Sequence, residues 1–221
     1  MDLLGLSIFG GQVDSKRRVD PWVYLAEKHR TLFLAGLIHG GASSFVGGMP
    51  VPHMNVAAVV DVMLALDCVS NEPIKLFIDS YGGGVEEGLM FYDIMQSLRS
   101  PVYTVGRGNC SSMAAVLLAS GMAEHRYAFA NCIMMLHLSR GEARGDYRER
   151  ARMELVLREY EKRVAGVIIK HCGKTDKSPE QILEEWADKN ELWMFPEQAL
   201  EYGLIDKIIT PEVFSQEIMP E

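Results

Sequence analysis

The segment of residues 102–121 most constrains the fold, because it reads as a strand, a glycine turn and an apolar helix in succession. Its first four residues are β-branched or aromatic, which favours a strand. Gly106 and Gly108 permit a sharp bend, and the apolar run 112–119, which ends at Gly121, predicts a buried helix. A serine at the start of that helix has backbone N–H groups and the positive end of the helix dipole beside it. That environment suits an acyl-transfer nucleophile, although a plain N-cap is the alternative.

Two further segments follow related patterns. Residues 74–79 form an apolar strand before three consecutive glycines, Gly82 to Gly84, and a helix is expected at 85–99. Such glycines allow backbone to approach a substrate closely, or they form an ordinary turn. Residues 132–137 are an apolar strand that ends in His137, which is either structural or catalytic. Strands that alternate with helices predict an α/β fold with a mainly parallel sheet.

Together these segments resemble the ClpP family, the proteolytic subunits of Clp protease. The family pattern G-x-x-x-S-M corresponds to residues 108–113, and the glycine-bearing oxyanion strand corresponds to residues 79–83. The strand that carries the family histidine corresponds to residues 135–137, and the E-E-A-x-x-Y-G-L-I-D signature resembles residues 197–206. The motifs occur in the family order, and the resemblance runs from about residue 24 to residue 209.

The resemblance implies a ClpP/crotonase-like α/β fold of repeated β-β-α units with a projecting handle helix. We expect a flexible arm at residues 1–20, a single peptidase domain at 21–210 with its handle at about 138–172, and a C-terminal tail at 211–221. The charged segment 146–171 repeats apolar residues every three or four positions, which predicts one long amphipathic helix. The glycine-rich loop at 39–52 is an insertion relative to the family.

The resemblance also implies the site residues. Ser112 corresponds to the nucleophile and His137 to the general base, while the backbone N–H groups of Gly83 and Met113 correspond to the oxyanion donors. Cys110 and Ser111 are alternative nucleophiles beside Ser112. No metal or other cofactor is implied, and the six histidines show no metal-ligand spacing.

The third member of the triad departs from the family. Where the family has an Arg-Asp pair, this chain has Asn190 and Glu191. Glu191 can orient an imidazole as aspartate does, with a longer reach, and Asp188 is a second candidate. Residues 138–139, Leu-Ser, replace the family Gln-Pro that shapes the substrate groove.

Composition excludes several classes of partner. The net charge of −8 argues against nucleic acid and anionic membranes, and no run reaches the ~18 apolar residues of a membrane span. The first residues lack the features of a signal peptide. The four separated cysteines predict free thiols in a reducing compartment, so we expect the cytoplasm.

The resemblance implies a self-compartmentalised serine endopeptidase that cleaves unfolded proteins and peptides inside heptameric rings, homo-oligomeric or mixed with related subunits. An AAA+ unfoldase ATPase would supply substrate, since no phosphate-binding loop ending in G-K-[ST] follows the glycines. Two alternatives stay open: a catalytically weak ClpP-like ring subunit, and a crotonase-fold enzyme that acts on acyl-CoA.

Overall fold

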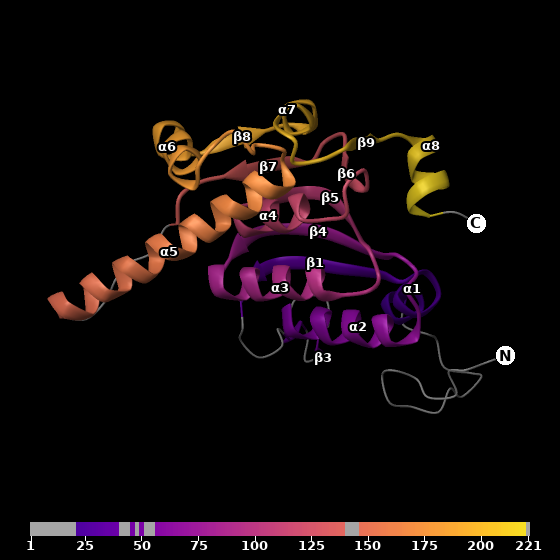
Figure 1. The fold of residues 1–221 in the computed structure, drawn as a ribbon. Coiled ribbons are helices and arrows are strands. Elements are labelled where there is room, and N and C mark those ends of the chain that lie inside the picture. The colour runs from indigo at the N-terminus through magenta and orange to yellow at the C-terminus, as the bar shows by residue number, and fades with distance from the viewer. Residues whose placement is uncertain (1–20, 40–44, 47–48, 51–55, 140–145, 220–221) are drawn as a thin grey trace.

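The computed structural model describes residues 21–39, 45–46, 49–50, 56–139 and 146–219. In these residues seven strands form one sheet with the path β1-β4-β5-β6-β9, and β7 branches from β5 to pair with β8. Every strand pair in that sheet is parallel except β7 with β8. The mixed sheet with helices around it confirms the expected α/β fold (Figure 1).

The strands of this sheet are short at its β8 and β9 ends and long at its centre. They are β1 (Thr31–Ile38), β4 (Ile74–Gly83), β5 (Val102–Ser111), β6 (Arg126–Phe129), β7 (Ile133–Leu136), β8 (Leu192–Met194) and β9 (Lys207–Ile209). A separate antiparallel pair consists of β2 (Phe45–Val46) and β3 (Met49–Pro50).

The helices that the sequence predicts at 85–99, 112–119 and 146–171 are present as α3 (Val85–Ser97), α4 (Met113–Ala119) and α5 (Tyr147–His171). The other helices are α1 (Pro21–His29), α2 (Val56–Val69), α6 (Pro179–Lys189), α7 (Pro196–Tyr202) and α8 (Pro211–Val213), which continues as the π-helical turn η2 (Phe214–Ile218) in the segment expected to be a C-terminal tail. Capping boxes at Asp146 and Ser178 start α5 and α6. Gly203, at φ +88°, ends α7.

The short helix α4 lies at the centre of the core. All seven of its residues are buried, and it packs against β4, β5, α3 and α5. An apolar helix without a polar face is stable only when other elements cover it on every side. This packing fixes the start of α4, and therefore Ser112, against the middle of the sheet.

The prediction of glycine turns is wrong in detail, because Gly106 and Gly108 lie inside β5 and Gly82 and Gly83 lie inside β4. β5 continues through Gly106 and Gly108 to Ser111, where Asn109 to Ser111 pair with β7. β4 likewise includes Gly82 and Gly83. A single residue separates each of these strands from the next helix: Gly84 lies between β4 and α3, and Ser112 lies between β5 and α4.

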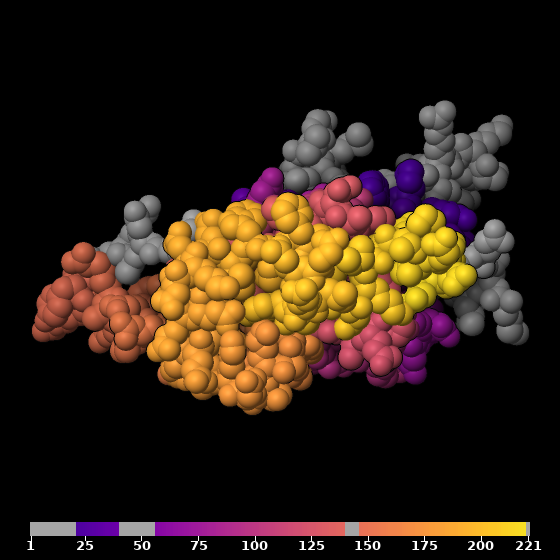
Figure 2. Space-filling view, turned by 90° about the horizontal axis from the view of Figure 1, so that it is seen from above, coloured from indigo at the N-terminus to yellow at the C-terminus, as the bar shows by residue number. Residues whose placement is uncertain are grey.

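The long helix α5 divides into two halves. Its C-terminal half buries Val164, Val167 and Ile168 in the core, whereas Met153, Leu155 and Val156 are 49%, 68% and 44% exposed. Figures 1 and 2 show the N-terminal turns of α5 extending beyond the rest of the chain. The predicted projecting helix is therefore present, although the part of the expected handle at 140–145 lies outside the described residues.

The residues after 210 pack on the sheet. Ile218 is buried with Phe77, Val105 and Tyr127 on the sheet face covered by α8 and η2. Glu217 accepts hydrogen bonds from the Tyr127 hydroxyl at 2.7 Å and from Lys207 at 2.6 Å. The predicted arm at 1–20 and most of the insertion at 39–52 lie outside the described residues.

Candidate active site

Ser112 has a backbone conformation that residues other than glycine rarely adopt. Its φ and ψ angles are +57° and −128°, and it is the N-cap of α4 without a side-chain capping bond. A non-glycine residue in this region costs about 1–3 kcal/mol. The strand-to-helix turn nevertheless carries a serine, which holds the hydroxyl at the junction of β5 and α4. Ser112 therefore occupies the N-cap position, but its side chain makes no capping hydrogen bond there.

The neighbouring nucleophile candidates point elsewhere. Cys110 is fully buried, and its thiol lies 3.3 Å from the Ile78 carbonyl oxygen and 3.9 Å from the sulfur of Cys132. The contact with Cys132 and burial raise the pKa of the Cys110 thiol well above its usual value, which opposes thiolate chemistry. Ser111 is 2% exposed and donates a 2.7 Å hydrogen bond to the Asn109 side chain.

The end of β4 passes very close to Ser112. A Cβ atom added to Gly82, whose φ is +89°, would lie 2.7 Å from the Cβ of Ser112, and one on Gly83 would lie 2.0 Å from the Ile38 carbonyl oxygen. No side chain fits at either position. The glycines thus permit the close approach of two backbone segments of this chain, and they do so within a strand.

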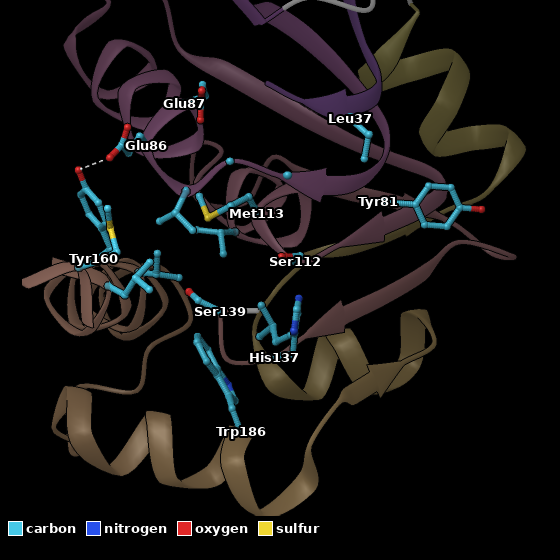
Figure 3. Close-up of a pocket in the computed structure, with 18 residues that line it drawn as sticks. Leu37, Tyr81, Glu86, Glu87, Ser112, Met113, His137, Ser139, Tyr160 and Trp186 are labelled. Atoms are coloured by element: carbon cyan, nitrogen blue, oxygen red, sulfur yellow. Dashed lines mark hydrogen bonds between the residues drawn. The ribbon is translucent and has the colours of Figure 1, made fainter. Parts of the chain in front are cut away.

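Ser112 and His137 line the same cavity, which has a volume of about 460 Å³ (Figure 3). His137 directly follows β7, and the parallel pairing of β7 with β5 brings the ends of both strands to this cavity. Gly83 and Met113 also line it, so four of the five predicted site residues share one cavity.

Glu191 directly precedes β8, a strand that the sequence does not predict. β8 pairs antiparallel with β7, and Leu192 lies opposite Leu136. Glu191 directly precedes Leu192 and His137 directly follows Leu136, so both residues flank the end of this ladder, and the Nδ1 atom of His137 is buried. Glu191 is half-buried and accepts a 2.8 Å hydrogen bond from the Trp193 indole. Asp188 lies on the exposed last turn of α6.

Several cavity residues escape sequence reasoning because they come from elements far apart in the chain. Glu86 and Glu87 lie in the first turn of α3, Tyr160 on α5 and Trp186 on α6. The two glutamates follow within four residues of the glycine end of β4, and this position is the signal that the sequence offers. Tyr160 and Trp186 carry no local signal, since only the packing of α5 and α6 brings them to the cavity.

None of the described helices is long and apolar enough to cross a membrane. Within the same described ranges, no three His, Cys, Asp or Glu side chains are grouped as metal ligands.

Comparison with models of known protein families matches residues 44–212 to the family described as Clp protease. The match spans more than half of the 221-residue chain, and the α/β sheet agrees with the ClpP/crotonase-like fold of that family. The family implies a peptidase, ring-forming oligomers and unfoldase partners in general. From the order of the strands, the cavity at the end of β5 and this match, we conclude that the chain belongs to the Clp protease family.

Proposed function

We propose that the protein is a serine endopeptidase with Ser112 as nucleophile and His137 as general base. The observation that carries the proposal is the strained Ser112, which lines one cavity together with His137. Backbone strain of this size persists only where the surroundings impose it, and it concentrates at reactive positions. Cys110 and Ser111 are buried and hydrogen-bonded away from the cavity, which leaves Ser112 as the hydroxyl available for attack.

In the proposed reaction the Ser112 hydroxyl attacks the carbonyl carbon of the scissile peptide while His137 takes its proton. The backbone N–H groups of Gly83 and Met113 stabilise the oxyanion, and the positive end of α4 favours the same charge. His137 then protonates the leaving amine, and a water molecule activated by His137 hydrolyses the acyl-enzyme.

Glu191 completes the proposed triad by holding His137 in the required orientation. Support comes from the β7–β8 ladder, in which Leu136 lies opposite Leu192: His137 directly follows the first residue and Glu191 directly precedes the second. If the pairing continued by one step, the two Cβ atoms would lie about 4.5–5.5 Å apart, which a glutamate side chain can span. Asp188 lies on an exposed helix end, so it is the weaker candidate.

The proposal extends to assembly in heptameric rings, of one subunit or of related subunits, that enclose the sites and receive unfolded polypeptide from an AAA+ unfoldase. Support comes from family membership and from the exposed residues Met153, Leu155 and Val156 on the projecting half of α5. A second copy of the chain is the expected cover for this stripe, because apolar side chains left in water promote aggregation. Light scattering at micromolar concentration tests it, and a monomer mass would contradict it.

Active-site labelling with a fluorophosphonate tests the serine mechanism. The reagent should modify Ser112 stoichiometrically and abolish hydrolysis of short unfolded peptides, and Ser112→Ala should lose both labelling and on the order of 10⁶-fold in rate. Ser111→Ala, one residue away, is the matched control and should keep labelling. If Ser112 stays unlabelled in a folded protein, the chain is instead a catalytically weak ring subunit.

Two measurements separate the remaining alternatives. A closed chamber predicts that short peptides are cleaved without ATP whereas a stably folded protein resists, and rapid digestion of the folded protein would contradict the chamber. Calorimetric titration with an acyl-CoA tests the crotonase-type alternative. Saturable binding of the thioester would favour that alternative over the peptidase.

A further inference from the structure

We propose that Ser80 is a positioning residue, whose buried hydroxyl holds the end of β4 so that the backbone N–H of Gly83 faces the reacting carbonyl. The inference rests on the proposed peptidase function and deepens it, because it names the group that orients one of the two proposed oxyanion donors. It comes from two hydrogen bonds of the Ser80 side chain at a point where the regular pairing of β4 is interrupted.

The ladder between β1 and β4 is irregular next to the site. The two strands pair one to one up to Asp79, and the pairing then shifts so that Gly36 alone faces the two residues Ser80 and Tyr81. This is the two-against-one arrangement of a β-bulge, which disrupts the regular ladder locally and often re-aims groups beside an active site. The glycine end of β4 therefore needs a further interaction that fixes its backbone after the bulge.

The Ser80 hydroxyl supplies that interaction. It accepts a 3.0 Å hydrogen bond from the Gly82 N–H and donates a 2.5 Å hydrogen bond to the Gly36 carbonyl oxygen. One side chain thus connects β4 to β1 across the bulge. Ser80 is only 1% exposed, whereas Tyr81 is 71% exposed and points away from Ser112 in Figure 3. Loss of the buried hydroxyl would take this partner from a backbone donor and from a backbone acceptor inside the protein, which is unfavourable.

The directions of the backbone groups carry this constraint to Gly83. The N–H of Gly82 faces β1 through the Ser80 hydroxyl, and the N–H of Gly84 donates a 2.7 Å hydrogen bond to the Ile38 carbonyl oxygen of the same strand. Successive residues of an extended strand direct their backbone groups to opposite sides. The N–H of Gly83, between these two, is therefore directed away from β1, on the side of the cavity that Gly83 lines.

The nucleophile leaves little room for movement of this strand end. A Cβ atom added to Gly82 would lie 2.7 Å from the Cβ of Ser112 and 3.0 Å from the backbone nitrogen of Met113, the second proposed donor. An oxyanion donor acts over about 2.7–3.1 Å, and a misplacement of about 1 Å can cost about 100-fold in rate. Because the donor acts on charge that develops in the transition state, loss of the Ser80 bonds should lower kcat more than it weakens substrate binding.

A purely structural role for Ser80 makes a different prediction. If the hydroxyl only stabilised the fold, Ser80→Ala would leave fewer folded molecules, and each folded molecule would keep the wild-type kcat. Exhaustive labelling with a fluorophosphonate counts the competent sites, whereas the rate constant of labelling depends on the oxyanion donors. Turnover per labelled site is therefore the readout that a structural role would not move.

The experiment compares Ser80→Ala with Ser120→Ala. Ser120 is 2% exposed, and its hydroxyl donates a 2.5 Å hydrogen bond to the Val116 carbonyl oxygen at the far end of α4. The control thus removes a buried hydroxyl of the same kind outside the site. For Ser80→Ala we expect kcat per labelled site to fall by about 10- to 100-fold, with KM within about 2-fold of the wild-type value.

Two further measurements sharpen the comparison. The affinity for a peptide boronic acid, which forms a tetrahedral adduct with the nucleophile, should fall in Ser80→Ala by a factor similar to that in kcat/KM. Ser120→Ala should keep the wild-type kcat, KM and boronic acid affinity. Ser80→Cys places a weak donor and acceptor at the same position, so its kcat per labelled site should fall less than in Ser80→Ala, and it serves as the test if Ser80→Ala does not fold.

The outcomes separate this inference from the proposed function. Wild-type kcat per labelled site in the folded Ser80 variants, or a rise in KM alone, would overturn the positioning role and leave the peptidase intact. An equal fall of kcat in Ser120→Ala would also overturn it, because loss of any buried hydroxyl would then have the same effect. Absence of all cleavage and of fluorophosphonate labelling in the wild-type protein would instead contradict the proposed function, and the positioning role with it.

Discussion

The backbone N–H of Ser112 donates a 2.7 Å hydrogen bond to the carbonyl oxygen of Met135. Met135 lies two residues before His137, so this bond joins the start of α4 to the strand that carries the proposed base. It also continues the parallel pairing of β5 with β7 by one step beyond Ser111. The position of Ser112 relative to the strand that precedes His137 is thus set by a sheet ladder.

The backbone strain at Ser112 predicts that the residue needed for activity lowers the stability of the protein. Ser112→Gly should be more stable than Ser112→Ala by about 1–2 kcal/mol, because glycine adopts a φ of +57° without the steric cost of a Cβ atom. Both variants should be inactive. Urea denaturation of the two proteins gives the comparison, and equal midpoints would mean that the turn stores no strain.

Glu191 should matter for turnover more than Asp188 does. Glu191→Gln keeps the size of the side chain but removes the charge that stabilises a protonated His137, so kcat should fall by about 10²–10⁴-fold with little change in the fold. Asp188→Asn is the matched control and should stay near the wild-type rate. If the two variants exchanged these effects, Asp188 would be the group that orients the imidazole.

Sequence reasoning anticipates the order of the elements because strand and helix signals are local. The apolar run of α4 and the three- and four-residue spacing of apolar side chains in α5 each depend on residues within a few positions. The strand β8 was missed, since three residues carry no periodicity and their pairing with β7 is a long-range contact. The site shows the same division: Ser112 and His137 follow from motifs, whereas Tyr160 and Trp186 reach the cavity only through packing.

Asp206 should be one of the most sensitive positions for stability. Its carboxylate accepts bonds from the Arg126 side chain at 2.8 Å and 2.5 Å and from the Arg126 backbone N–H at 3.0 Å. Arg126 is only 7% exposed and also donates to the carbonyl oxygens of Gly203 and His171. This pair joins β6, α7 and the end of α5 at one point.

Asp206→Asn would leave the buried guanidinium of Arg126 without its counter-charge, and removal of one partner of a buried pair costs about 3–5 kcal/mol. Chemical denaturation should register that loss. Glu154→Gln, which breaks an exposed pair with Arg158, should cost no more than about 0.5 kcal/mol. Similar small losses in both variants would show that the Arg126–Asp206 pair contributes no more than a surface contact.

The lowered pKa of His171 predicts that the protein becomes less stable in mildly acidic solution. Burial lowers the pKa of this imidazole to about 4, and the nearby positive charges of Lys170 and Arg126 act in the same direction. Its ring nitrogen lies 3.3 Å from the Tyr92 hydroxyl at the end of α5. In the unfolded chain the imidazole has an ordinary pKa of about 6.5.

Between these two values the unfolded state binds the proton and the folded state does not. The contribution of His171 to stability is therefore complete above about pH 6.5 and is lost progressively as the pH falls towards about 4. Replacing the imidazole by a group that does not titrate should flatten this part of the stability curve. We expect His171→Gln to narrow the difference in urea midpoint between pH 7 and pH 5, while His29→Gln on α1 keeps the wild-type difference. If His171→Gln kept the wild-type difference in urea midpoint between the two pH values, other groups would be the cause of the acid sensitivity.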